Sequence, residues 1–479
     1  MSGLSLSKRS DCVKTFNDPV RTAYDVVAES FYHETQNQKN QFTCNIKDLD
    51  LKIMSSRSDC VLEFSDPVRE ASEATCSNPY HETENPQGIV DLCMSQNTLI
   101  SDLILEKLQQ PELLKWEKTM LTYTERRGTA RLRVAIAKFL EDQTGSPQQI
   151  DPDKMCIMNG VTGVMNLLTY VLFEEGDTVL CPAPFYYSIP RDIMYISKIK
   201  VYPVPLSSKP GENGLKPFEL TVDHLEKALE KARKEGHNVR GVFFVNPSNP
   251  LGLVYTKEQV LDYLAFCKKH SLQVIMDEIY QGSIHDESIP NSSILGLPLE
   301  AIPDTQNTHI LYGFSKDFGI PGAPLGVLHS WNKDVLDRCI GLNDYQQASS
   351  FIQSAAAKMI EDKDWLRGTY FPTNLSRMRD ASRVTMETLD EIGATYLKPQ
   401  AGLYIWANLS KFLAQDNEEE ERRFTNHLLK GGVGLSPSAG YCGGEYGWYR
   451  IMFAVPRNRL VEGLQRLKKS CLSFDSSRS

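Results

Sequence analysis

The residues from His309 to Gly326 read HILYGFSKDFGIPGAPLG. The stretch opens with an apolar run of the kind that forms a buried β-strand, and Ser315 and Lys316 follow the run at once. Three glycines and two prolines then interrupt regular structure between Asp317 and Gly326. The stretch therefore predicts a buried strand that ends in a lysine.

Three more short runs, rich in Val and Ile, end in polar loops and are separated by amphipathic segments. The runs are TVLCPAP from Thr178, VRGVFFVNP from Val239 and LQVIMDE from Leu272. Residues 220–236 have one apolar helical face, and Thr256 with Gln259 forms a capping-box pattern. The apolar face consists of Leu225, Ala228, Leu229 and Ala232. This alternation predicts a mostly parallel sheet covered on both faces, with ligands at the carboxyl ends of its strands.

Composition argues against several classes of partner. The chain has 479 residues, enough for two domains, with a net charge of −9 and a pI of about 5.6. Without a dense Lys/Arg run, we expect neither nucleic acid nor an anionic membrane as partner. No apolar run is long enough to span a membrane, and the first residues lack a secretory signal. The eleven cysteines lack metal-ligand spacing, so we expect no metal site, reduced thiols and a cytoplasmic location.

The predicted strand ends collect four side chains with a shared chemical use: Lys316, Asp277, Tyr280 and Asn249. Motifs for dinucleotides, P-loops, zinc proteases and serine hydrolases are missing from the sequence. Pyridoxal 5′-phosphate needs this set, because a lysine forms its Schiff base, an acid keeps the pyridine nitrogen protonated, and hydroxyl and amide donors hold its phenolate oxygen. Each residue also has an ordinary alternative, namely a solvated lysine, a helix-capping aspartate beside a core tyrosine, and a turn.

Six motifs occur in the order of a known family: NPYHETENPQGIVDL, NPSNPLG, DEIY, SKDFGIPG, AGLYIW and YRIMFA. From Asn78 to about residue 470, the chain resembles fold-type I, aspartate-aminotransferase-like enzymes that use pyridoxal phosphate. More narrowly, it resembles 1-aminocyclopropane-1-carboxylate (ACC) synthases and their animal ACC-synthase-like relatives. The resemblance implies an α/β fold with a large domain, built on a mostly parallel seven-stranded sheet covered by helices, and a smaller α+β domain. It also implies a homodimer and a small amino acid as substrate.

The resemblance assigns roles to individual residues. Lys316 forms the covalent link to the cofactor and moves protons, Asp277 pairs with the pyridine nitrogen, and Tyr280 and Asn249 hold the phenolate oxygen. Tyr186 stacks on the ring, with a buried core tyrosine as the alternative. The remaining assignments are cofactor contacts for Val161, Thr162, Gly163 and Ser315, with the first three around the phosphate, and a substrate-carboxylate clamp for Arg450. A structural salt bridge is the alternative for Arg450.

The chain departs from the family pattern at four positions. Pro324 replaces an arginine that binds the cofactor phosphate, and Gly313 replaces a serine three residues before the lysine. Losing an arginine from a site with about −1.5 to −2 charge weakens binding by a few kcal/mol if nothing replaces it. Arg126 aligns with a tyrosine that reaches across the dimer, so it either supplies charge to the neighbouring subunit or faces solvent. Gln96 replaces a substrate-side glutamate and lacks the charge that favours a sulfonium substrate.

The chain also predicts a domain organisation. RSDCVKTFNDPVR from Arg9 reappears as RSDCVLEFSDPVR from Arg57, and we expect the duplicated residues 1–75 to be poorly ordered. The expected remainder is a small-domain segment at 76–110, a large cofactor-binding domain at 111–350, a small C-terminal domain at 351–470 and a tail at 471–479. The acidic run NEEEERR at 417–423 is expected to be exposed.

Two functions remain open at this stage. The retained lysine, aspartate, tyrosine and Arg450 favour an enzyme on small amino acids, of the aminotransferase or carbon–sulfur lyase type, with doubtful ACC synthase activity. Pro324, Gly313, Arg126 and Gln96 favour a non-catalytic dimeric relative that binds the cofactor weakly and acts through partners.

Overall fold

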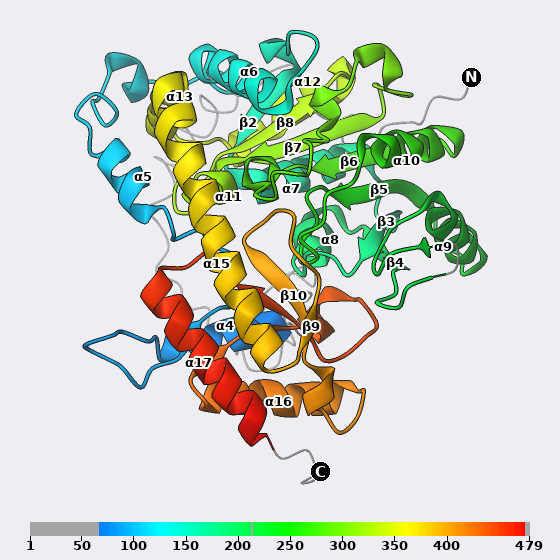
Figure 1. Cartoon of the computed structure of the whole chain (residues 1–479). Helices are drawn as coiled ribbons and strands as arrows, with labels where there is room; N and C mark the ends of the chain where they lie inside the picture. Colours follow the sequence, from blue (N-terminus) through cyan, green and yellow to red (C-terminus); the bar gives the residue numbers. More distant parts are fainter. Residues whose placement is uncertain (1–66, 212–213, 475–479) are drawn as a thin grey trace, which may run out of the picture.

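A seven-stranded sheet covered by helices on both faces dominates the computed structural model of this chain, which describes residues 67–211 and 214–474 (Figure 1). Side chains alternate across the sheet, as β-geometry requires. Val242 and Phe244 of β5 (Val239–Val245) join one apolar core, whereas Phe243 and Val245 join the other. Because both faces are buried, the strands carry continuous apolar runs.

The strand order is β2-β8-β7-β6-β5-β3-β4. The other bounds are Met155–Met158 (β2), Thr178–Ala183 (β3), Lys200–Pro205 (β4), Gln273–Asp277 (β6), Thr308–Gly313 (β7) and Gly326–Ser330 (β8). Five strands from β4 to β7 run parallel, and β8 lies antiparallel between β7 and β2. The predicted mostly parallel seven-stranded sheet is therefore confirmed.

Two of the predicted helices form as expected. Thr221 caps α9 (Val222–Lys234), whose buried residues are the four of the predicted apolar face. Thr256 accepts a hydrogen bond from the Gln259 backbone N–H at the start of α10 (Lys257–Lys269), and the Gln259 side chain completes the capping box. Both helices pack on the face of the sheet that holds Val242 and Phe244.

A smaller antiparallel sheet has the order β12-β13-β10-β9, with bounds Ser436–Pro437, Trp448–Met452, Tyr404–Asn408 and Thr395–Tyr396. Near it lie α4 (Pro67–Ser77), α15 (Phe371–Glu391), α16 (Glu418–Lys430) and α17 (Arg457–Ser473) (Figure 1). The short strand β1 (Val90–Asp91) pairs with β11 (Val433–Gly434). The N-terminal segment thereby joins the C-terminal part of the chain.

Two expectations need correction. Poor order up to residue 75 is wrong for its last part, because 67–75 belong to α4, which buries Val68 and Ala71. The copy of the repeat at Arg9 lies outside the described residues, as does most of the copy at Arg57. The acidic run is only partly exposed, because Glu421 is buried and accepts hydrogen bonds from the backbone N–H groups of Ala439 and Gly447.

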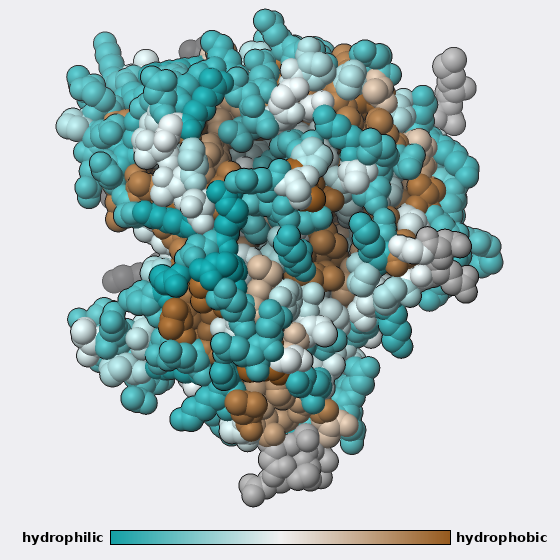
Figure 2. Space-filling model, viewed as in Figure 1, coloured by the Kyte–Doolittle hydropathy of each residue, from teal (hydrophilic) through white to brown (hydrophobic). Residues whose placement is uncertain are grey.

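Hydrophilic residues cover most of the face shown in Figure 2, with separate apolar areas between them. Across 67–211 and 214–474, each helix is too short or too polar to cross a membrane.

A close backbone crossing shapes the region where β8 meets α7 (Gly160–Leu172). A Cβ atom on Gly326 would lie 2.3 Å from the carbonyl carbon and oxygen of Gly160. Gly160 itself has φ of +75°, a backbone conformation that favours glycine. Gly326 therefore allows the first turn of α7 to lie against the sheet.

Gly326→Ala should lower the free energy of unfolding by about 3 kcal/mol, because the added methyl group meets backbone that cannot rotate away. Urea unfolding measures the change. Gly322→Ala is the matched control, since a Cβ there meets no atom within 4 Å and should change stability by less than about 0.5 kcal/mol. Equal stability of the two variants would contradict the close crossing.

Candidate active site

A cavity of about 240 Å³ lies at the carboxyl ends of β5 and β6, beside the first turn of α7. Eight of the residues predicted for the site line it: Val161, Thr162, Tyr186, Asn249, Asp277, Tyr280, Ser315 and Lys316. The structure thus brings together side chains from five separate stretches of the chain. Tyr186 is half-buried and lines the cavity wall.

Lys316 lies in the short helix α11 (Phe314–Asp317), which begins where β7 ends. Its Nζ donates a hydrogen bond of 2.7 Å to the backbone carbonyl of Ser95. The Ser95 hydroxyl lies 3.1 Å from the hydroxyl of Tyr280. Ser95 therefore contacts both the lysine and the tyrosine of the site. Sequence reasoning missed it, and its only signal was its position directly before Gln96.

Burial moves the pKa values of Lys316 and Asp277, which both line the cavity, toward 7. Burial, followed by the charge of Arg450, lowers the pKa of Lys316 to about 8, although Asp277 acts in the opposite direction. Burial raises the pKa of Asp277 to about 7, although a hydrogen bond from the Ile279 N–H and the charge of Lys316 lower it. Groups with such pKa values exchange protons readily near pH 7.

Arg450 lies on β13 of the small sheet and is 1% exposed. Its Nη1 donates to the side-chain oxygen of Asn249 at 3.0 Å, and its Nη2 donates to the carbonyl of Cys93 at 2.8 Å. Its guanidinium also lies 5.2 Å from the ring centre of Tyr404 and 5.5 Å from that of Tyr441. Its buried Nε has no hydrogen-bond partner among the described residues, and it forms no ion pair there. The salt-bridge alternative is thus absent from 67–211 and 214–474.

The first turn of α7 forms a cup whose backbone N–H groups have no partner within the helix. Pro324 lines this cup and approaches Gly160. A Cβ on Gly313 would lie 2.7 Å from a methyl group of Val161, so a serine does not fit there unless Val161 moves. Apolar atoms therefore occupy both positions where the family places phosphate ligands.

Four predicted residues do not line the cavity: Arg450, which reaches it only through its hydrogen bond to Asn249, and Gln96, Gly163 and Arg126. Gln96 is exposed, and the Cα of Gly163 faces the side chain of Gln346. Arg126 is also exposed, and its guanidinium forms two contacts of 3.0 Å with the carboxylate of Asp344.

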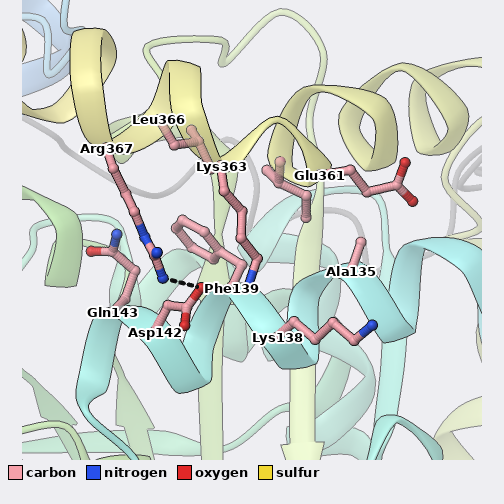
Figure 3. A pocket seen from close by; sticks show the side chains of 10 residues that line it. Ala135, Lys138, Phe139, Asp142, Gln143, Glu361, Lys363, Leu366 and Arg367 are labelled. Carbon is pink, nitrogen blue, oxygen red and sulfur yellow. Dashed lines mark ion pairs between the residues drawn. The ribbon is translucent and has the colours of Figure 1, made fainter.

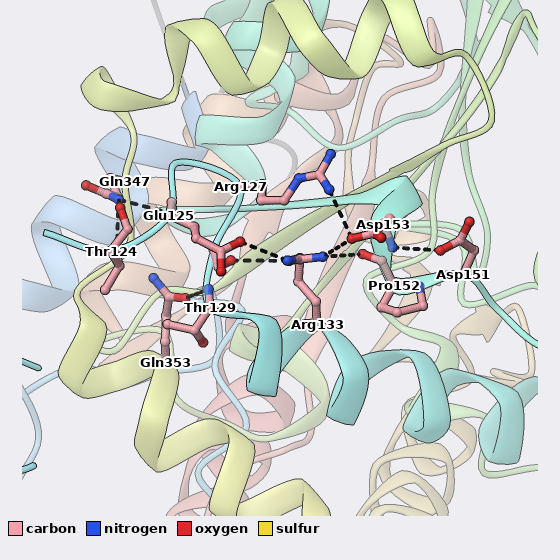
Figure 4. A network of polar contacts seen from close by, with 11 residues as sticks. Thr124, Glu125, Arg127, Thr129, Arg133, Asp151, Pro152, Asp153, Gln347 and Gln353 are labelled. Atoms are coloured by element: carbon pink, nitrogen blue, oxygen red, sulfur yellow. Dashed lines mark hydrogen bonds and ion pairs between the residues drawn. The ribbon is translucent and has the colours of Figure 1, made fainter. Parts of the chain in front are cut away.

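The loop that carries Arg126 is held on both sides (Figure 4). Buried Arg133 of α6 (Ala130–Thr144) donates to Glu125 at 2.9 Å and to Asp153 at 2.6 Å, and Arg127 donates to the same Asp153 oxygen at 3.0 Å. The neighbours of Arg126 are therefore anchored to their own chain, while Arg126 itself does not line the cavity of that chain.

A second cavity, of about 160 Å³, lies between α6 and the segment that ends in the π-helical turn Leu366–Tyr370 (Figure 3). Asp142 pairs there with Lys363 at 2.9 Å and Arg367 at 2.8 Å. Asp142 is thus paired with two of the cations that line this cavity, and Glu361 of the lining pairs with Arg131 at 2.5 Å.

Residues 87–467 match the profile of the family described as aminotransferase class I and II. The chain belongs to this family. The 1-aminocyclopropane-1-carboxylate synthase-like protein 1 of Mus musculus is 36% identical over 384 residues, which cover 80% of this chain and 76% of that protein. A Homo sapiens relative named probable inactive 1-aminocyclopropane-1-carboxylate synthase-like protein 2 is 36% identical over 379 residues, covering 79% of this chain and 66% of its own length. The predicted resemblance is confirmed.

The fold is that of solved aminotransferases. The crystal structure of the aspartate aminotransferase from Rhizobium meliloti superposes with a TM-score of 0.71 at 17% identity, covering 88% of this chain and 99% of that structure. The α/β fold predicted from the resemblance is therefore confirmed.

Aminotransferases of class I and II use pyridoxal 5′-phosphate, and the donor set of the cavity fits it. An amine, a carboxyl group with a raised pKa and a phenol share one cavity, and unpaired N–H groups at a helix N-terminus face it. The phosphate end fits less well, because Lys316 is the only Lys or Arg among the described residues that line the cavity.

In the cofactor-free protein, Lys316 should titrate with a pKa of about 8, far below the value of about 10.4 for an exposed lysine. Competitive acetylation across pH, read by peptide mapping, measures this value. Asp277→Asn should lower it further, because the Asp277 carboxylate stabilises the charged amine. Asp223→Asn, on the surface of α9, should leave it unchanged. Titration of Lys316 near pH 10 would contradict the buried environment.

Proposed function

We propose that this aminotransferase-family chain is an active pyridoxal-phosphate-dependent enzyme on small amino acids, by amino transfer or carbon–sulfur cleavage. The observation that supports it most directly is the presence of Lys316 and Asp277 in one cavity with pKa values of about 8 and about 7. Groups with pKa values shifted in this way within one cavity are typical of sites that transfer protons.

The bound cofactor would supply an electron sink that accepts the electron pair left when the substrate Cα–H bond is broken. Asp277 would hold a proton at the pyridine nitrogen, and Tyr280 with Asn249 would orient the ring oxygen. The Lys316 amine would remove and return the α-proton, because a base with a pKa near the working pH does so efficiently. Arg450, whose Nε has no hydrogen-bond partner among the described residues, would bind the substrate α-carboxylate.

A non-catalytic relative is the second candidate. The observation that favours it is that the described lining of the phosphate cup contains no cation, with Pro324 and Gly313 at the positions of family ligands. One relative that is 36% identical to this chain carries the name probable inactive 1-aminocyclopropane-1-carboxylate synthase-like protein 2. Cofactor binding without turnover would be the signature of this candidate.

Borohydride reduction of the cofactor-loaded protein should place a pyridoxyl label on Lys316. Lys316→Ala should lose the label and all activity, whereas Lys333→Ala, at an exposed lysine, should keep both. With S-adenosylmethionine, we expect oxoacid or ammonia in preference to ACC, because neutral Gln96 gives no advantage to a sulfonium cation.

An amino-acid panel, followed by assays for oxoacid, ammonia and ACC, separates the outcomes. Label on Lys316 without any product would favour the non-catalytic relative. ACC release with kcat/KM of about 10⁴ M⁻¹s⁻¹ or more would contradict the expected preference for amino transfer or carbon–sulfur cleavage. If Gln96→Glu did not increase ACC release, the role given to the missing charge at Gln96 would be contradicted.

We further propose that the protein is a homodimer with Arg126 at a shared site. Four exposed aromatic and apolar side chains, Trp116, Leu121, Tyr123 and Tyr345, form what we name the apolar patch. Their segments touch each other, since Gln347 donates to the Thr124 hydroxyl at 3.0 Å and Trp116 stacks on Phe351 at 4.7 Å. A second copy would cover the apolar patch and place Arg126 beside the cofactor phosphate of its partner.

Arg126→Ala should then raise the dissociation constant of the cofactor tenfold or more, about 1.4 kcal/mol per decade. Arg383→Ala is the control, because that arginine is similarly exposed and lies on α15. An unchanged constant would leave Arg126 as a surface residue. A monomer in sedimentation equilibrium would refute the shared site.

A further inference from the structure

A buried carboxyl group, that of Asp192, lies beside the phosphate cup and has no role in the proposed reaction. Asp192 lies in the first turn of α8 (Ile189–Ser197) and is 9% exposed. Its Oδ2 accepts a hydrogen bond of 3.3 Å from the hydroxyl of Thr162, which lines the cavity at the start of α7. A carboxylate thus lies one hydroxyl group away from the position where a cofactor phosphate would bind.

The surroundings of Asp192 neutralise it only in part. The nearest cation is Arg191 on the same helix, whose Nε lies 3.7 Å from Oδ1 and whose Nη2 donates to the Ser188 hydroxyl at 2.7 Å. The other titratable groups that face Asp192 are Tyr186 and Asp277. The charge of Asp192 raises the pKa of both groups. Neither of these two groups offers a positive charge.

The Thr162 hydroxyl has one proton to donate. If Asp192 is ionised, the carboxylate competes with the phosphate for this proton, and the two anions repel each other. If a proton is present on either anion, the hydroxyl bridges them as donor to one and acceptor from the other. We propose that the cup binds a phosphate monoester together with one proton, which Asp192 and the phosphate share through the Thr162 hydroxyl. This inference rests on the proposed use of pyridoxal phosphate.

The direction of the pH dependence follows from the two groups. Burial raises the pKa of Asp192 to about 6, although Arg191 and Thr162 lower it. The second pKa of a phosphate monoester is also about 6. Above this pH both free groups are ionised, so binding must take up a proton. The affinity of the phosphate group therefore falls as pH rises, by up to about tenfold per unit.

The test compares pyridoxal phosphate with pyridoxal, which lacks the phosphate, so that effects on Lys316 cancel. Absorbance titrations at pH 7.0, 7.5, 8.0 and 8.5 measure the dissociation constant of each aldehyde. The quantity compared is the dissociation constant of pyridoxal divided by that of pyridoxal phosphate. In the native protein this ratio should fall about tenfold from pH 7 to pH 8. Calorimetry in buffers with different ionisation enthalpies should show one extra proton taken up with pyridoxal phosphate.

Asp192→Asn should make the ratio constant within twofold and raise it tenfold or more at pH 8. Thr162→Ser keeps the hydroxyl and should keep the pH dependence, as should Asp337→Asn on the exposed side of α12 (Lys333–Leu342). A pH-independent ratio in the native protein, or an unchanged ratio in Asp192→Asn, would refute this inference and leave the proposed function standing. A protein that binds neither aldehyde would refute both.

Discussion

A buried guanidinium without a carboxylate partner is the constraint on which the site depends. Arg450 is 1% exposed, and removing such a charge from water costs several kcal/mol unless polar groups replace the water. An amide oxygen of Asn249, the carbonyl of Cys93 and two tyrosine faces do so here. These partners come from both sheets and from the N-terminal segment, so one charge holds three distant parts of the chain together.

The segment from Cys93 to Ser95 has a larger role than its sequence indicates. Its carbonyls accept hydrogen bonds from both cations of the site, Arg450 at Cys93 and Lys316 at Ser95. Because β1 precedes it and pairs with β11, its position depends on the packing of the C-terminal region. A shift of this segment therefore moves the proposed substrate clamp and the cofactor lysine together, although Arg450 lies on β13 of the small sheet and Lys316 lies in α11.

The sequence predicts the features that are encoded locally. The apolar runs of β5 and β6 and the capping box of α10 form where their patterns place them, because burial on both faces and backbone capping leave a direct signature. The antiparallel direction of β8 leaves none, since an apolar run does not record its direction. Most of the strand-end residues share one cavity, but Ser95 and Asp192 were missed because their contacts join residues far apart in the chain. The exposed Gln96 and Arg126 do not reach the cavity of their own chain.

The cavity has an end with Lys316 and Asp277 and an end at the phosphate cup, and the side chains at these two ends differ in how they affect the stability of the fold. This difference bears on the proposed function. Burial shifts the pKa values of Lys316 and Asp277 toward neutrality, and each shift means that the folded chain holds a charged group in an unfavourable environment. At the phosphate end, Pro324 and Gly313 carry no charge, and the buried ionisable group beside them is the carboxyl group of Asp192 and not a cation. A chain that kept the cofactor only as a structural ligand would need cations at the phosphate and could replace the amine and the carboxyl group with apolar residues. The arrangement here is the reverse, with two ionisable groups at the proposed reacting atoms and, among the described residues that line the phosphate end, no Lys or Arg side chain, which supports the proposed proton transfer with a weakly held phosphate.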